Sequence, residues 1–134
     1  MPNMNYAKID TSGYPIVKVT YAPQEPTLEE FDAYLSSMEA LYDDYSDFVI
    51  IMDASSTKYL SSELRIRQGN WMKKNESKMK TQVLGIVFII PSAIVRMILN
   101  GIFLIQKLPV PYSVSSNMEE ANKWAHEKLS VKVT

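Results

Sequence analysis

The 134-residue chain contains no cysteine and only one histidine, His126. The lack of cysteine excludes disulfide bridges, thiolate metal sites and a cysteine nucleophile, and it is compatible with a cytoplasmic location. With a single histidine, the chain cannot form a metal site or a catalytic pair from two imidazoles. Neither a GxxxxGK loop nor a GxGxxG turn occurs, which argues against the common nucleotide-binding motifs. We therefore expect no metal, no cofactor and no enzymatic activity.

The chain also lacks a strong net charge, although its charges are unevenly distributed. The formal net charge of -1 predicts no general attraction to nucleic acid or to an anionic membrane. No Lys or Arg occurs between Lys18 and Lys58, an interval rich in Asp and Glu, whereas basic residues outnumber acidic ones from Lys58 to Lys80. Two interpretations are open: solvated helix faces of opposite sign that could be neighbours, or an acidic and a basic docking surface.

The spacing of apolar residues predicts an alternation of strands and helices. Residues that alternate around the TSG turn predict a hairpin, and continuous apolar runs such as FVIIMDAS predict strands covered on both faces. A capping box at Thr27 and Glu30 opens a helix that ends near Tyr45. Strands are predicted at 6–10, 14–21, from 48, at 83–90 and at 110–115; helices are predicted from 27, from 61 or 62 to about 79, after 92 and from 117.

The resulting order, ββαβαβαβα, is typical of an α/β protein. No repeat, low-complexity run or flexible linker divides the chain, so we expect one domain over residues 1–134. Buried strands that alternate with helices imply a mixed, mostly parallel sheet with helical cover.

The stretch SAIVRMILNGIFLIQKLP, residues 92–109, is more apolar than a surface helix requires. A transmembrane span is not expected, because Pro91 separates it from the preceding strand and Arg96 and Asn100 interrupt it. Apolar residues nevertheless surround the helix axis, so part of this surface should meet a second subunit, a lipid-like ligand or a membrane surface. The candidate residues for a dimer or ligand surface are Ile94, Ile98, Ile102 and Phe103.

A second candidate surface lies on the helix predicted from Ser61 or Ser62. Its members share one helix face, at positions i, i+4, i+7 and i+11: Arg67, Trp71, Lys74 and Lys78. An exposed tryptophan among cations could contact an anionic ligand or an acidic protein partner. Alternatively, Trp71 is buried with Leu64 and Met72, and the cations only solubilise the helix.

Several segments together resemble a known family. They are the TLEEF start of the first helix, the two serines that open the helix after FVIIMDAS, and the closing PYSVSSNMEEANKWAHEKL. With the order ββαβαβαβα, these segments resemble the SpoIIAA-like branch of the STAS proteins, which are relatives of the anti-sigma-factor antagonists and are grouped with the Sec14-type lipid-binding fold. The resemblance implies a STAS-like fold over nearly the whole chain.

In antagonists of this type, a partner kinase phosphorylates a serine at the start of the corresponding helix, and the unphosphorylated form binds that partner. The resemblance therefore implies Ser61 or Ser62 as the phosphate acceptor. Such antagonists usually carry Asp before the serines and Gly after them, whereas this chain has Leu60 and Glu63. A serine at a helix start is also a common N-cap without any other role.

These observations predict a non-catalytic regulatory or protein-interaction module that forms a homodimer through the apolar helix after Ser92. Its other partner would be a kinase-like or regulatory protein. The alternative is a carrier or sensor of a small hydrophobic, lipid-like ligand held beneath that helix, as the Sec14 kinship implies.

Overall fold

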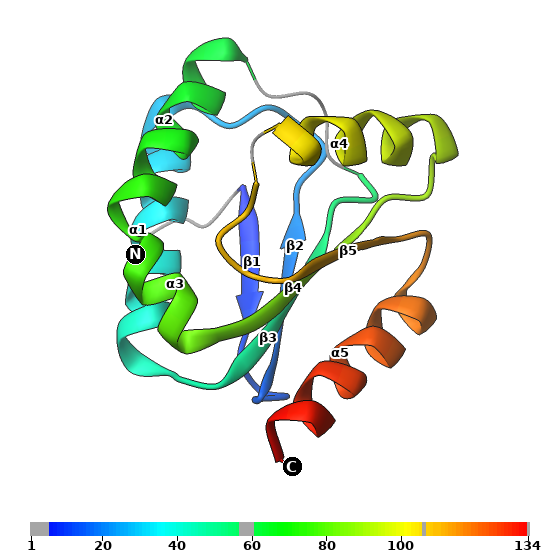
Figure 1. Cartoon of the computed structure of the whole chain (residues 1–134). Coiled ribbons are helices and arrows are strands. Elements are labelled where there is room, and N and C mark those ends of the chain that lie inside the picture. The colour runs from blue at the N-terminus through cyan, green and yellow to red at the C-terminus, as the bar shows by residue number, and fades with distance from the viewer. Residues whose placement is uncertain (1–5, 57–60, 106, 134) are drawn as a thin grey trace.

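A computed structural model of the chain describes residues 6–56, 61–105 and 107–133, without the side chains of residues 102, 105 and 131–133. Five strands and five helices follow one another along these residues (Figure 1). Their bounds are β1 Ala7–Asp10, β2 Ile16–Tyr21, α1 Leu28–Asp44, β3 Phe48–Asp53, α2 Ser62–Lys74, α3 Glu76–Gln82, β4 Val83–Ile89, α4 Ala93–Ile105, β5 Tyr112–Ser115 and α5 Met118–Val133.

The strands form one sheet in the order β1-β2-β3-β4-β5. The hairpin partner β1 is antiparallel to β2, and the other three pairings are parallel. This confirms the predicted α/β class with a mixed, mostly parallel sheet. Each parallel connection passes through helices, so α2 and α4 both begin near the edge where the parallel strands end.

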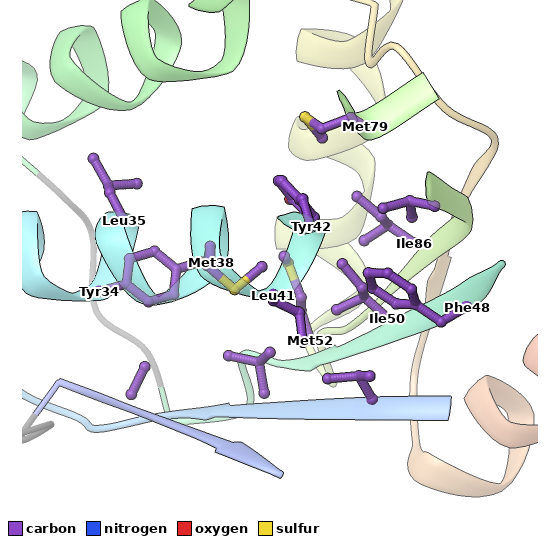
Figure 2. Packing of buried hydrophobic residues seen from close by; sticks show 14 of the residues in the cluster. Tyr34, Leu35, Met38, Leu41, Tyr42, Phe48, Ile50, Met52, Met79 and Ile86 are labelled. Atoms are coloured by element: carbon purple, nitrogen blue, oxygen red, sulfur yellow. The ribbon is translucent and has the colours of Figure 1, made fainter. Parts of the chain in front are cut away.

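Two hydrophobic cores lie on opposite faces of the sheet. On one face, residues of α1 and α3 pack against β3 and β4, as Figure 2 shows for Tyr34, Leu35, Met38, Leu41, Tyr42, Phe48, Ile50, Met52, Met79 and Ile86. On the other face, Ala121 and Ala125 of α5 pack against Val49, Ile51 and Val87. The central strand β3 is buried from Phe48 to Met52, which is the predicted pattern of a strand covered on both sides.

The structure contains one helix more than the predicted order, because the segment expected as a single helix to about Met79 is broken at Asn75. Asn75 has φ -103° and ψ 12°, outside the helical region, and its side chain is 2% exposed. Its Nδ2 donates hydrogen bonds to Glu39 Oε1 of α1 (3.2 Å) and to the carbonyl of Trp71 (3.0 Å). The break thus coincides with a contact with α1 that the local sequence does not reveal.

The predicted capping box of α1 is present. The side chain of Thr27 accepts a hydrogen bond from the Glu30 amide (3.1 Å), and Glu30 Oε1 accepts one from the Thr27 amide (2.8 Å). At the start of α5, Asn117 Oδ1 accepts from the Glu120 amide (2.9 Å), while the Glu120 carboxylate bonds the Ser116 hydroxyl. Side-chain caps thus lie at the beginning of both helices. The capping box is complete at α1, whereas at α5 the Asn117 cap is present and the Glu120 carboxylate bonds Ser116 instead.

Candidate functional site

The start of α2 presents both predicted serines at the surface. Ser61 is the N-cap, and its Oγ accepts from the Leu64 amide at 3.4 Å. The Ser61 amide donates to Glu25 Oε1 (2.8 Å), a residue of the loop between β2 and α1. Ser62, the first helical residue, accepts a hydrogen bond on its Oγ from Arg65 Nη2 at 3.2 Å. The two serines therefore have different electrostatic surroundings: the amide of Ser61 is bonded to a carboxylate, and the hydroxyl of Ser62 is bonded to a guanidinium.

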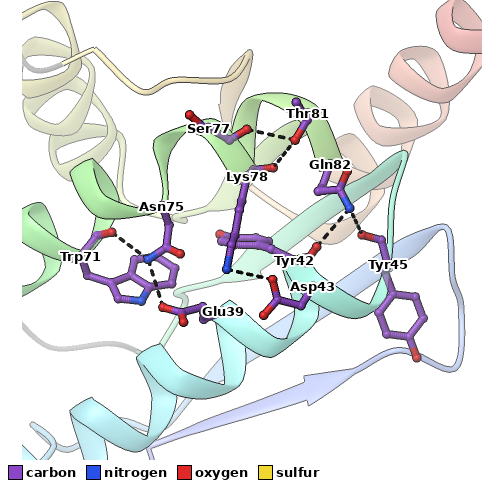
Figure 3. Close-up of polar contacts among 10 residues, drawn as sticks. All are labelled: Glu39, Tyr42, Asp43, Tyr45, Trp71, Asn75, Ser77, Lys78, Thr81 and Gln82. Atoms are coloured by element: carbon purple, nitrogen blue, oxygen red, sulfur yellow. Dashed lines mark hydrogen bonds and ion pairs between the residues drawn. The ribbon is translucent and has the colours of Figure 1, made fainter.

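The predicted basic face turns toward the acidic face of α1. Arg67 Nη1 lies 3.3 Å from Asp32 Oδ1, and Lys78 Nζ lies 2.8 Å from Asp43 Oδ1 (Figure 3 shows the second pair). The hydrogen bond to Asp43 raises the pKa of Lys78 above its ordinary value. Helix faces of opposite sign are thus neighbours, the first of the two interpretations that the charge pattern left open.

Trp71 packs into the interface of the same helices. Its ring lies 5.8 Å from that of Tyr42 on α1 and contacts the first hydrophobic core, to which Leu64 belongs. Its indole Nε1 is buried without a hydrogen-bond partner among the described residues. Because Asn75 interrupts the helix, Lys78 lies on α3 and the four residues do not form the continuous face that the spacing predicted. Contact of this region with an anionic partner stays a prediction.

A groove with a volume of about 680 Å³ runs between α1 and α2. Both charge signs and several apolar side chains line it: Asp32, Leu35, Ser36, Glu39, Glu63, Ile66, Arg67, Asn70, Trp71 and Lys74. Three of the predicted contact residues, Arg67, Trp71 and Lys74, are thereby brought together. The mixed charges of its walls give no single ligand class an advantage.

Helix α4 has one side that faces the sheet. The ring of Phe103 lies 5.5 Å from Phe88 and 4.7 Å from Tyr112. Arg96 Nη1 donates to the carbonyls of Ile90 and Pro91, both at 2.8 Å. The half-buried Leu99 lies on the same side of the helix. Phe103, predicted on the dimer or ligand surface, therefore points away from solvent, toward β4 and β5.

The opposite side of α4 is apolar and exposed. Ile94, Met97, Ile98 and Leu104 are 67%, 68%, 57% and 77% exposed. Ile94 and Ile98 belong to the predicted surface, whereas Met97 and Leu104 were missed although they share its helical spacing. The side chain of Ile102 lies outside the described residues. In Figure 1, α4 lies at the same end of the molecule as the start of α2.

The alternative of a hydrophobic ligand beneath α4 is not favoured by this geometry. The ring of Phe103 contacts Phe88 and Tyr112 at the position that such a ligand would take.

Among the described residues, His, Asp and Glu form no group of three or more that could hold a metal ion. No helix in the described part of the chain has the length and hydrophobicity that a membrane crossing requires.

Comparison with known proteins bears on the fold. No model of a protein family matches the sequence, and no curated protein matches it significantly. Similar solved structures include an uncharacterised protein of the DUF3478 family with a SpoIIAA-like fold from Shewanella loihica PV-4, with a TM-score of 0.69 and 11% identity over 89% of this chain and 91% of that chain. An anti-sigma factor antagonist from Mycobacterium paratuberculosis has a TM-score of 0.55 and 16% identity over 90% of this chain and 92% of that chain.

At these identities the similarity concerns the fold alone. It agrees with the resemblance seen in the sequence. The chain therefore has the SpoIIAA-like fold of the STAS proteins.

Proposed function

We propose that the protein is a non-catalytic regulatory module that binds another protein at the end of the fold where α2 begins, and that it acts as a homodimer. The observation that carries this proposal is the pair of exposed serines at that helix start, on a fold shared with an anti-sigma factor antagonist. A phosphate on one of them would carry about -1.5 to -2 charges and would face the positive end of the helix dipole. It would change a docking surface without rearranging the cores.

Of the two serines, Ser62 is the better acceptor. Arg65 already donates to the Ser62 hydroxyl, so a phosphate there would gain a charge-assisted hydrogen bond. A phosphate on Ser61 would lie beside the Glu25 carboxylate, which is bonded to the Ser61 amide, and would be repelled by it. Ser61 remains the N-cap of α2 whether or not Ser62 is phosphorylated.

Mass spectrometry of the protein purified from its own cells tests this proposal. We expect one phosphate group, located on Ser62 by peptide sequencing. The Ser62→Ala variant should lose this phosphate, whereas the matched Ser61→Ala variant should retain it. A chain without phosphate on either serine under all growth conditions would contradict the regulatory mechanism.

The partner provides a second measurement. We expect a protein that co-purifies with Ser62→Ala and is lost from Ser62→Asp, because the added carboxylate imitates the charge of the modified form. Glu63→Gln is a suitable control, since it changes a neighbouring charge without affecting the acceptor hydroxyl. Equal recovery with both Ser62 variants would mean that this serine does not control binding.

A further inference from the structure

Four of the exposed apolar side chains of α4, together with Gly101, form a continuous stripe. Ile94, Met97, Ile98, Gly101 and Leu104 occupy positions i, i+3, i+4, i+7 and i+10, which share one face of a helix. The residues that hold α4 to the sheet, Arg96 and Phe103, lie on the opposite side. The outer stripe is therefore free to contact another molecule while the inner side keeps the helix in place.

The stripe carries no charge. Arg96 is the only charged residue of α4, and its guanidinium is bound to the carbonyls of Ile90 and Pro91. An amphipathic helix that binds anionic lipid is usually bordered by Lys and Arg on its polar face, and α4 has no such border. Because two uncharged apolar surfaces meet without repulsion, a second copy of the same stripe is a suitable partner.

Gly101 lies in the middle of the stripe. A Cβ atom added at this position would meet nothing within 4 Å among the described residues, so none of them requires a glycine there. Glycine is unfavourable in a helix interior, but it allows two helix backbones to approach closely. A helix of a second molecule that crosses at Gly101 would give this residue a packing role.

We propose that α4 packs against α4 of a second copy across a two-fold axis that passes close to Gly101. This inference rests on the proposed function, since it names the surface of the proposed homodimer. The four exposed side chains of the stripe form a patch on the order of several hundred Å², the size of the largest apolar patch on a typical monomer, which is often functional. A standard interface buries about 800 Å² on each partner, so we expect a dimer that dissociates on dilution.

Sedimentation velocity with matched charge variants tests the location of the interface. Ile94 on α4 and Ile66 on α2 are 67% and 65% exposed, so Glu replaces an equally exposed isoleucine at both positions. We expect the unmodified chain and Ile66→Glu to be dimers and Ile94→Glu to be a monomer. Loss of the dimer in Ile66→Glu alone, or in neither variant, would overturn the assignment to α4. Phe103→Glu is unsuitable, because that side chain packs against the sheet.

A cysteine introduced at the crossing point tests the two-fold axis directly. The chain has no cysteine of its own, so the single thiol of Gly101→Cys can form a disulfide only with a second copy. With diamide as the oxidant, which takes up the two hydrogens of the thiols, we expect a covalent dimer. Gly69→Cys on α2 is the control, because Gly69 is also a helical glycine, and an added Cβ atom would meet nothing within 4 Å in the described part of the chain. Equal cross-linking of both variants would contradict a crossing at Gly101.

The outcomes separate this inference from the proposed function. A chain that is monomeric at all concentrations but carries phosphate on Ser62 would overturn the α4 dimer and leave the regulatory proposal standing. If the dimer is lost in Ile94→Glu and the chain never carries phosphate, the α4 dimer would stand and the regulatory proposal would be overturned. A monomer that floats with phosphatidylcholine vesicles, and loses this property in Ile94→Glu, would assign the stripe to lipid and overturn the dimer.

Discussion

Gly85 illustrates, at the residue scale, how closely α5 approaches the sheet. A Cβ atom added to Gly85 of β4 would lie 2.7 Å from Cη2 of Trp124 and 3.3 Å from the carbonyl oxygen of Pro111. The indole ring thus occupies the space of the missing side chain. Glycine is required here by contact with a neighbouring element, because only this residue lets the ring lie on the strand.

We expect Gly85→Ala to lower the free energy of unfolding by about 1–3 kcal/mol, the usual cost of adding atoms to a packed core. Urea denaturation followed by circular dichroism measures the change. Gly69→Ala is the matched control: its new methyl group would meet nothing within 4 Å, and the variant should gain up to about 1 kcal/mol of helix stability. Equal effects of the two substitutions would show that Trp124 moves aside without cost.

At the element scale, one buried polar side chain lies at the break between α2 and α3. The amide of Asn75 connects Glu39 of α1 to the Trp71 carbonyl, and Gln82 at the end of α3 donates to the carbonyls of Tyr42 (3.1 Å) and Tyr45 (3.0 Å), as Figure 3 shows. Both ends of α3 are thereby tied to the region of α1. These bonds position the broken helix pair against α1, while the ion pairs at the surface add little.

Asn75→Ala should remove two hydrogen bonds and leave the Glu39 carboxylate without this donor. We expect a loss of about 1–3 kcal/mol in the free energy of unfolding, typical of a broken buried hydrogen-bond network. Asn70→Ala, an exposed position on α2, should change it by less than about 0.5 kcal/mol. Chemical denaturation of both variants measures these free energies of unfolding. If Asn75→Ala is as stable as the unmodified chain, the break would be assigned to another residue.

At the scale of the whole molecule, a cluster of tyrosines in the first core joins β2 and α1 to Tyr6, the residue that precedes β1. The ring of Tyr6 lies 5.4 Å from the rings of both Tyr21 and Tyr34, and the hydroxyls of Tyr21 and Tyr34 are 2.5 Å apart. Burial raises the pKa of Tyr6 from 10.0 to about 12 and also raises the pKa values of Tyr21 and Tyr34. The folded chain therefore holds these protons at pH values where an unfolded chain releases them.

The stability of the protein should consequently depend on alkaline pH. Between the unfolded pKa of Tyr6, near 10, and its folded pKa of about 12, the folded state binds more protons than the unfolded state, so the free energy of unfolding falls as pH rises. Below pH 10 this contribution is fully present. Tyr6→Phe should make the fall less steep, as measured by urea denaturation from pH 8 to 12. Identical slopes would mean that Tyr6 does not titrate differently in the two states.

The sequence alone determined the order in which the strands and most helices follow one another along the chain. Periodicity and capping are local properties, so Thr27 and Glu30 mark the start of α1, and the apolar run from Phe48 marks a strand covered on both faces. These features depend on residues that are close in the chain. The mostly parallel sheet followed from their alternation.

Only the tertiary structure decided the orientation of α4 and the break at Asn75. Because apolar residues surround α4, its periodicity does not indicate which side faces the sheet; contact of Phe103 with Phe88 and Tyr112 determines this. Likewise, Asn75 leaves the helical conformation where Glu39, far away in the sequence, accepts its hydrogen bond. The orientation of α4 and the break at Asn75 both depend on partners that only folding brings together. The contacts of Phe103 with the sheet turn that residue inward and leave Ile94 and Ile98 exposed on the outer stripe.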